Sequence, residues 1–108
     1  MDEHRLKCFV AVYEQGSVSA AATRLHMTQP PLSMLLRKLE GELGVCLFDR
    51  SGHRLAPTAT GELFYLRAKA LLAQLQTMRR ELREAEQGAR GTVHIGCATA
   101  ASLFVMPA

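Results

Sequence analysis

The sequence has little of what marks an enzyme, a metalloprotein or a membrane protein. It contains no tryptophan, four phenylalanines, two tyrosines and three cysteines, and it has no apolar run long enough to span a bilayer. The cysteines (Cys8, Cys46 and Cys97) are far apart and odd in number, and the four histidines are scattered. We therefore expect reduced thiols, no metal site and no cofactor.

Other absences argue against catalysis and export. No nucleophile, base and acid cluster at short spacing, and the chain has no glycine-rich phosphate loop, so we expect no enzymatic activity. The first residues lead into an amphipathic pattern instead of an apolar signal-peptide core. This start predicts a cytoplasmic protein without membrane contact.

The 108 residues that are present fit one small domain with an appendage. Hydrophobic residues make up 48% of the chain and charged residues only 21%, which argues against disorder. The low aromatic content predicts a mostly α fold built from leucine and alanine. A net charge of +3 fits a nucleic-acid partner but does not establish one.

Two helices are predicted at the start of the chain. Asp2 can cap the first, whose apolar residues recur at three- and four-residue spacing until Gly16. Ser17 or Ser19 can cap the second, which is rich in alanine. Small side chains let another helix approach closely, as a helix-turn-helix requires.

A third helix is predicted to begin at a proline pair and to have one apolar and one polar face. Thr28 is placed to cap it, and Pro30 and Pro31 fall in its first turn, where a missing N–H costs no intrahelical bond. The apolar stripe is Leu32, Leu36, Leu39 and Leu43; the polar stripe is Gln29, Ser33, Arg37 and Glu40, with Met34 and Lys38 beside it. Such a face is either an ordinary solvated surface or one that reads base edges in the major groove.

Gly44 ends the third helix, and two short β-prone runs follow it over residues 45–48 and 54–57. A Ser51-Gly52 turn between them predicts a small hairpin, or wing. The cationic residues of this wing are Arg50, His53 and Arg54. They suit DNA phosphates or the narrow minor groove, and the alternative is a solvated loop.

Thr58 is predicted to open a long helix that runs to about Glu86 or Gln87, before Gly88. Its apolar residues alternate between four- and three-residue spacing, which is typical of an a/d heptad seam. The seam residues are Phe64, Ala68, Leu71, Leu75, Met78, Leu82 and Ala85. One small domain cannot bury this helix along its full length, so we expect a homodimer. The alternative is a helix that folds back on its own domain.

The character of the sequence changes after Gly91. Residues 92–97 alternate and are β-branched, which predicts a strand, and residues 98–108 are apolar. A lone strand has no partner, so residues 91–108 are interpreted as the start of a truncated α/β domain.

In combination these motifs resemble the LysR-type transcriptional regulators. The matching segments are Leu6-Lys7-Cys8-Phe9-Val10-Ala11-Val12, Gly16-Ser17-Val18, Ala21-Ala22-x-x-Leu25, Thr28-Gln29-Pro30-Pro31-Leu32-Ser33, Leu39-Glu40-x-Glu42-Leu43-Gly44, Leu47-Phe48-x-Arg50 and Thr58-x-x-Gly61. The resemblance implies a winged helix-turn-helix over residues 1–58, a linker and dimerisation helix over 59–90 and the start of an effector-binding domain over 91–108.

The resemblance also implies a function and its residues. A bacterial regulator, dimeric and often tetrameric, would bind double-stranded DNA at an interrupted dyad promoter site, with RNA polymerase as a further candidate partner. The implied DNA-binding residues are Ser17, Thr28, Gln29, Pro30, Pro31, Ser33, Met34, Arg37, Lys38, Arg50, His53 and Arg54. A small-molecule effector would bind only a full-length form, with Thr99, Ala100 and Ser102 on one wall of its cleft.

One departure from the pattern is informative: many members of the family have polar residues where this chain has Met34 and Leu35. A thioether cannot make a bidentate hydrogen bond, so Met34 is expected to contact a thymine methyl or to read nothing. The competing hypothesis for the whole chain is a helical dimerisation module that associates with longer partners and does not bind DNA.

Overall fold

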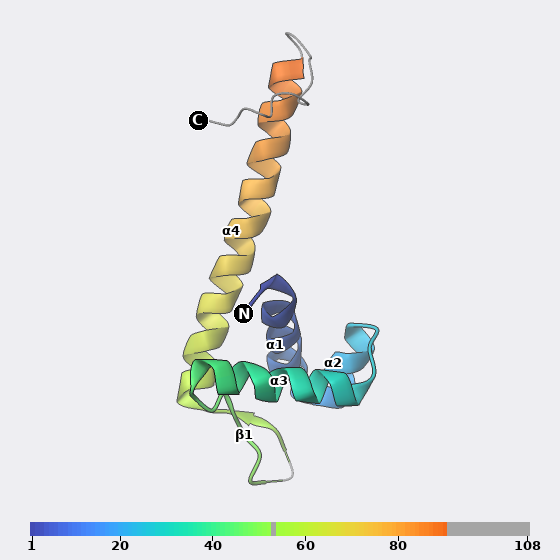
Figure 1. The fold of residues 1–108 in the computed structure, drawn as a ribbon, viewed down its shortest axis with the longest axis vertical. Helices are drawn as coiled ribbons and strands as arrows, with labels where there is room; N and C mark the ends of the chain where they lie inside the picture. The colour runs from blue at the N-terminus through green and yellow to red at the C-terminus, as the bar shows by residue number, and fades with distance from the viewer. Residues whose placement is uncertain (53, 91–108) are drawn as a thin grey trace. The chain divides into compact units, whose positions relative to one another are not determined.

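The computed structural model describes residues 1–52 and 54–90, and it confirms a mostly α fold with a small antiparallel wing (Figure 1). The elements are α1 (Glu3–Gln15), α2 (Val18–Arg24), α3 (Gln29–Leu43), β1 (Phe48–Asp49), β2 (Ala56–Pro57) and α4 (Ala59–Arg90). The expected C-terminal strand, the effector residues Thr99, Ala100 and Ser102, and His53 lie outside the described residues.

The ends of α1 and α2 follow the predicted signals. Asp2 caps α1, because its carboxylate accepts a hydrogen bond from the Arg5 N–H at 3.0 Å. Gly16 ends α1 at a φ of +76°, which favours glycine. Of the two candidate serines, Ser17 caps α2: its hydroxyl accepts from the Ala20 N–H at 3.0 Å.

A tight turn joins α2 to α3. His26 has a φ of +58°, in the left-handed region, and the Met27 N–H donates to the carbonyl of Ala22 at 2.9 Å. Thr28 occupies the N-cap position of α3, but its hydroxyl makes no capping bond, so that part of the prediction was wrong. The two prolines lie in the first turn as expected, and Gly44 ends α3 at a φ of +71°.

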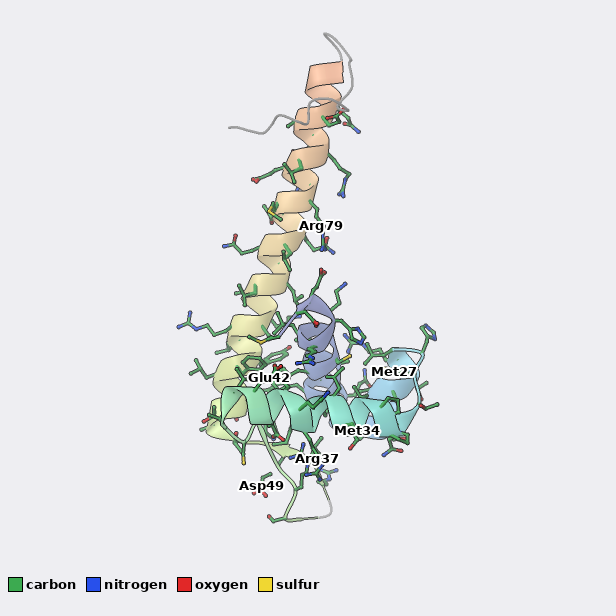
Figure 2. All side chains as sticks on the ribbon, viewed as in Figure 1. Met27, Met34, Arg37, Glu42, Asp49 and Arg79 are labelled. Carbon is green, nitrogen blue, oxygen red and sulfur yellow. The ribbon has the colours of Figure 1, made fainter. Side chains whose placement is uncertain are left out.

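Helix α3 is tied to α1 by charge as well as by packing. Arg5 of α1 donates to the carboxylate of Glu42, labelled in Figure 2, at 2.7 Å. The terminal amine of Met1 lies 3.4 Å from the other oxygen of the same carboxylate. Both contacts link the C-terminal half of α3 to the start of α1, but the Glu42 side chain is exposed and such pairs contribute little to stability.

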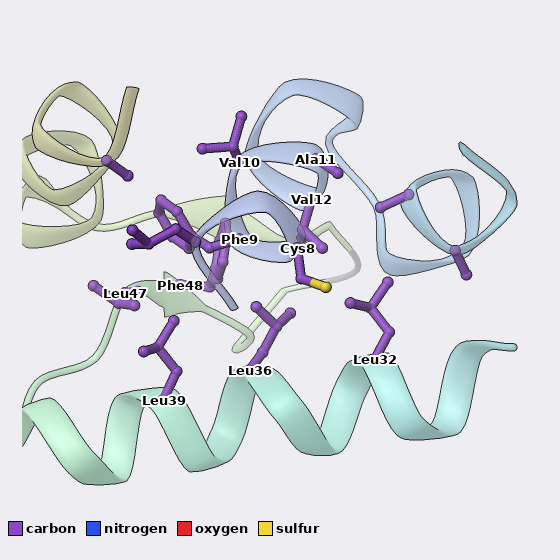
Figure 3. Close-up of a cluster of buried hydrophobic side chains, with 14 residues drawn as sticks. Cys8, Phe9, Val10, Ala11, Val12, Leu32, Leu36, Leu39, Leu47 and Phe48 are labelled. Carbon is purple, nitrogen blue, oxygen red and sulfur yellow. The ribbon is translucent and has the colours of Figure 1, made fainter. Parts of the chain in front are cut away.

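The core lies between α1 and the leucine stripe of α3. Leu32, Leu36 and Leu39 point from α3 toward α1, whose Cys8 and Val12 are fully buried (Figure 3). The ring of Phe9 in α1 also meets the wing and α4. Its centroid is 5.4 Å from that of Phe48 and 4.8 Å from that of Phe64. One phenylalanine thus holds three elements together.

The start of α4 is locked to the chain just before the wing. The Thr58 hydroxyl accepts from the Gly61 N–H at 2.9 Å, which caps the helix, and donates to the carbonyl of Cys46 at 2.6 Å. The Thr58 N–H donates to the carbonyl of Leu47 at 3.0 Å. Gly61 is buried, and a Cβ there would collide with the carbonyl oxygen of Leu47. This close approach of α4 to the chain before β1 requires glycine.

The chain forms two compact units, residues 1–73 and residues from Gln74 onward, and α4 contributes to both. In the first unit Ala68 is 0% exposed and Phe64 packs on Phe9. The predicted dimer seam was therefore wrong for Ala68, whose side chain faces its own core, and Phe64 is shared with that core. Helix α4 also passes Gly88 and continues to Arg90, further than predicted.

Candidate nucleic-acid interface

The side of α3 away from α1 is exposed and carries most of the expected DNA-binding residues. Met34 and Arg37 lie on this side in Figure 2. Seven of the expected DNA-binding residues on α3 and its cap are exposed and Ser33 is half-buried; the exposed ones are Thr28, Gln29, Pro30, Pro31, Met34, Arg37 and Lys38. At about 100° per residue, Met34 lies roughly opposite the buried Leu36, with Arg37 and Lys38 in the next turn. We call this side of α3 the outer face.

The cations of the outer face are available to an anionic ligand. Among the described residues, Arg37 and Lys38 form no ion pair or hydrogen bond. The acidic residues Glu40 and Glu42 of the same helix are occupied by Arg50 and Arg5. The outer face is therefore positive where it is most exposed, and phosphate groups complement such a surface.

A shallow hollow of about 640 Å³ lies beside the start of α3. It brings together three predicted DNA-binding residues from different elements: Ser17 at the cap of α2, Gln29 at the start of α3, and Arg54 of the wing. Its full lining is Gln15, Gly16, Ser17, Val18, Ser19, Gln29, Arg54 and Leu55. Arg54 is exposed and has no partner among the described residues, so its guanidinium is free to meet a phosphate.

Glu40 does not belong to the outer face, contrary to the predicted polar stripe. Its carboxylate accepts hydrogen bonds from the N–H groups of Leu47 at 2.7 Å and Phe48 at 3.2 Å. The carboxylate also lies 3.1 Å from the guanidinium of Arg50, and the Glu40 side chain is only 12% exposed. Glu40 therefore holds β1 against α3. Arg50, which was expected to contact DNA, forms an ion pair with a residue of its own domain.

A second carboxylate fixes the first half of α4 on the domain. Glu14 of α1 accepts from the Tyr65 hydroxyl at 2.6 Å and from Lys69 at 3.2 Å, and it also pairs with Arg24 of α2. The hydroxyl of Tyr65, more than the two cations, lowers the pKa of Glu14 to about 2. The rings of Tyr13 and Tyr65 stack with centroids 3.9 Å apart. Sequence reasoning missed this cluster because its members are up to 55 positions apart.

The remaining residues of the predicted seam differ in exposure. Leu71, Met78 and Leu82 are among the exposed large hydrophobic residues, Ala85 is exposed, and Leu75 is half-buried. Large apolar side chains at regular spacing on an otherwise charged helix are unusual for a surface that stays in water. In the described residues, no helix combines the length and apolar character that crossing a bilayer would require.

The buried thiol of Cys8 offers no competing site. Cys8 is buried beside His4, with its sulfur 3.7 Å from the His4 ring nitrogen Nε2, and burial raises the pKa of the thiol, which keeps it protonated. Within residues 1–52 and 54–90 no group of three or more histidine, cysteine or acidic side chains is arranged to hold a metal ion.

Three helices with a tight turn between the second and third, followed by a two-stranded wing, define a winged helix-turn-helix domain. Its outer face carries the free cations described above. Residues 4–62 match the family described as "Bacterial regulatory helix-turn-helix protein, lysR family", and the chain belongs to this family.

The similarity to curated relatives extends along nearly the whole chain. The HTH-type transcriptional regulator BsdA of Bacillus subtilis (strain 168) is 38% identical over 97 residues, which are 89% of this chain and 33% of BsdA. The nitrogen assimilation regulatory protein nac of Escherichia coli (strain K12) is 39% identical over 109 residues, with 99% of this chain and 36% of nac covered. The chain thus spans about a third of the length of the curated relatives it matches.

Solved structures share the fold. The BenM_DBD/benA site 1 DNA complex superposes with a TM-score of 0.79 at 36% identity, covering 82% of this chain and 99% of that chain. The CbnR_DBD–DNA complex has a TM-score of 0.76 at 39% identity, covering 79% and 98%. Both relatives were crystallised with DNA.

Proposed function

We propose that this chain is the DNA-binding part of a sequence-specific transcriptional regulator that recognises double-stranded promoter DNA. The observation that carries the proposal is the outer face of α3, where Arg37 and Lys38 are exposed and have no partner among the described residues. Two solved relatives with the same fold are complexes with DNA, which supports this assignment.

In this proposal α3 enters the major groove with its N-terminal end leading. Gln29 can pair with an adenine edge through its amide, and Ser33 can donate to or accept from a neighbouring base. Arg37 and Lys38 neutralise phosphates beside the groove. The free N–H groups of the first turn of α3 favour a further phosphate, although Pro30 and Pro31 contribute none.

The wing extends the contact along the duplex. Arg54 shares the hollow with Gln29 and Ser17, so a phosphate seated there would touch both the wing and the helix-turn-helix. His53 and Arg50 were also expected on DNA. His53 lies outside the described residues. Because Arg50 pairs with Glu40, we assign it the role of holding the wing on α3.

We further propose that two chains associate through the exposed seam of α4 and present two outer faces to an interrupted dyad site. Leu71, Met78 and Leu82 supply the apolar surface for this association. A longer form with a complete effector domain would bind a small molecule, assemble further into tetramers and contact RNA polymerase in the cytoplasm. Thr99, Ala100 and Ser102 remain the proposed start of the effector site.

A fluorescence-anisotropy titration tests the proposal. The chain is titrated into a labelled interrupted palindrome and into a scrambled duplex of the same composition. We expect tighter binding to the palindrome by two protomers, and loss of that preference in the variants Gln29→Ala and Arg54→Ala. Lys7→Ala is the charge-matched control, because Lys7 lies on α1 and pairs with Glu3.

Salt dependence tests the phosphate contacts separately. Each lost phosphate contact should reduce the slope of log K against log salt concentration by about 0.9 for B-DNA. Arg37→Ala in a dimer removes two contacts and should reduce the slope by about twice that amount. A wild-type affinity that does not change with salt, together with equal binding to both duplexes and intact dimerisation, would favour the helical dimerisation module instead.

A further inference from the structure

Met34 is exposed without a structural reason in its own domain. It is 66% exposed, whereas the other large apolar residues of α3 are buried or half-buried. The leucine stripe explains those residues, since Leu32, Leu36 and Leu39 fill the core. Nothing in the packing of the domain requires a large apolar side chain at position 34.

Met34 lies on α3 between the proline pair of the first turn and the two cations of the outer face. Pro30 and Pro31 precede it by one helical turn, and Arg37 and Lys38 follow it by one turn. Under the proposed function, the two cations engage the DNA backbone while the middle of the outer face meets the base edges. The centre of that face is therefore apolar, with positive charge on its C-terminal side.

Only one feature of a base edge complements an apolar side chain in the major groove. Thymine presents its C5-methyl group there, whereas the other edge groups are hydrogen-bond donors or acceptors. A thioether side chain is unbranched, polarisable and adaptable, so it can cover a methyl group without a fixed geometry. It offers at most a weak acceptor to the polar edges of the other bases.

We propose that Met34 is a specificity-determining residue that reads the 5-methyl group of one thymine in each half-site. This inference rests on the proposed function. The side chain selects thymine by burying a methyl group that cytosine and uracil lack, and it forms no base-specific hydrogen bond. Its contribution is therefore independent of the hydrogen bonds of Gln29 and Ser33.

Replacing thymine by deoxyuridine tests this directly, because the change deletes the methyl group and preserves every hydrogen-bonding group of the base pair. Each thymine of a bound half-site is replaced in turn, symmetrically in both halves, and affinity is measured by anisotropy. We expect one position at which wild-type binding weakens about fourfold per half-site, the value of one buried methyl group.

Variants at position 34 link the effect to Met34. Met34→Ala should bind the thymine and deoxyuridine duplexes equally at that position, and Met34→Leu should keep most of the difference. Lys38→Ala is the matched control: it should weaken binding to both duplexes by the same factor. Thermal melting of each variant verifies folding. Because Met34 and Lys38 are exposed, we expect their substitutions to leave the fold intact.

Two results would overturn the inference and are distinguishable. If the wild type prefers the palindrome but no thymine position gives a loss that depends on Met34, the methyl readout is wrong and the proposed function stands. If the wild type binds the palindrome and the scrambled duplex equally, the proposed function fails and the readout fails with it.

Discussion

Two of the helical glycines, Gly41 and Gly61, have opposite surroundings. A Cβ added to Gly41, on α3, would meet nothing within 4 Å. A Cβ added to Gly61, in the first turn of α4, would collide with the Leu47 carbonyl. Glycine lowers helix stability relative to alanine through its backbone freedom. At Gly41 no packing contact offsets the lower helix stability. At Gly61 the missing Cβ permits the contact between α4 and the chain before the wing.

The same substitution at these two positions should therefore have opposite effects. Gly41→Ala is expected to raise the free energy of unfolding by about 0.5–1 kcal/mol. Gly61→Ala should lower the free energy of unfolding and shift the start of α4. Urea denaturation followed by circular dichroism measures both. Two changes of the same sign would show that the contact with Leu47 does not control the fold at this point.

Glu40 is the residue whose removal should most affect the wing. Glu40→Ala leaves the N–H groups of Leu47 and Phe48 without their acceptor, and hydrogen bonds to a charged group contribute about 1.5–3 kcal/mol. We expect a loss of stability of that size and faster hydrogen exchange at those two amides. The control is Glu42→Ala on the same helix, because the Glu42 ion pairs are exposed and should contribute little.

At the scale of elements, both ends of α1 and the C-terminal end of α3 were the best-predicted part of the fold. Asp2, Gly16 and Gly44 act locally, through their own side chain or their own φ, so their signals are readable in the sequence. The wing was correctly expected after α3, but its strands are only two residues each. Strand length depends on pairing with the opposite strand, and adjacent residues do not encode it.

The candidate site was predictable where exposure follows helical periodicity, and less so elsewhere. The outer face of α3 follows directly from its leucine stripe. Glu40 was misassigned because a carboxylate at the edge of a polar stripe can point to solvent or to a neighbouring strand. Ala68 was misassigned because a four-and-three spacing suits a partner helix and the helix's own domain equally well.

The Glu14 cluster gives the attachment of α4 a defined pH dependence. The pKa of Glu14 is lowered from 4.5 to about 2 in the folded chain, so the unfolded chain binds the proton more readily. Its stabilising contribution is therefore fully present above about pH 4.5 and is lost as the pH falls toward 2. Glu14→Gln should be less stable than the wild type at neutral pH, and the difference should narrow over this range.

Chemical denaturation at a series of pH values measures that difference. Glu81→Gln is the control, since Glu81 is exposed on α4 and has no ion pair among the described residues. A constant difference between Glu14→Gln and the wild type from neutral pH down to pH 2 would contradict the role given to Glu14.

At the scale of the whole molecule, under the proposed function, association through α4 decides whether one or two outer faces meet the DNA. Leu82 is 62% exposed and lies on the proposed seam. The next residue, Arg83, is not one of the seam residues. Leu82→Ala should weaken the dimer by about 2 kcal/mol per protomer, the value of burying one leucine side chain. Sedimentation equilibrium measures the dissociation constant. Arg83→Ala should leave it nearly unchanged, and equal effects of both changes would argue against the seam.

The contact of Gly61 with Leu47 also determines which sequences can encode this fold. Every other amino acid has a Cβ, so a saturation-mutagenesis library selected for folded protein should lose all alternatives at codon 61 and retain most of them at codon 41. Strict selection for glycine at codon 61 would thus mark the junction between the winged helix-turn-helix domain and α4. Under the proposed function, substitutions on the outer face could change the preferred DNA sequence while this junction stays fixed.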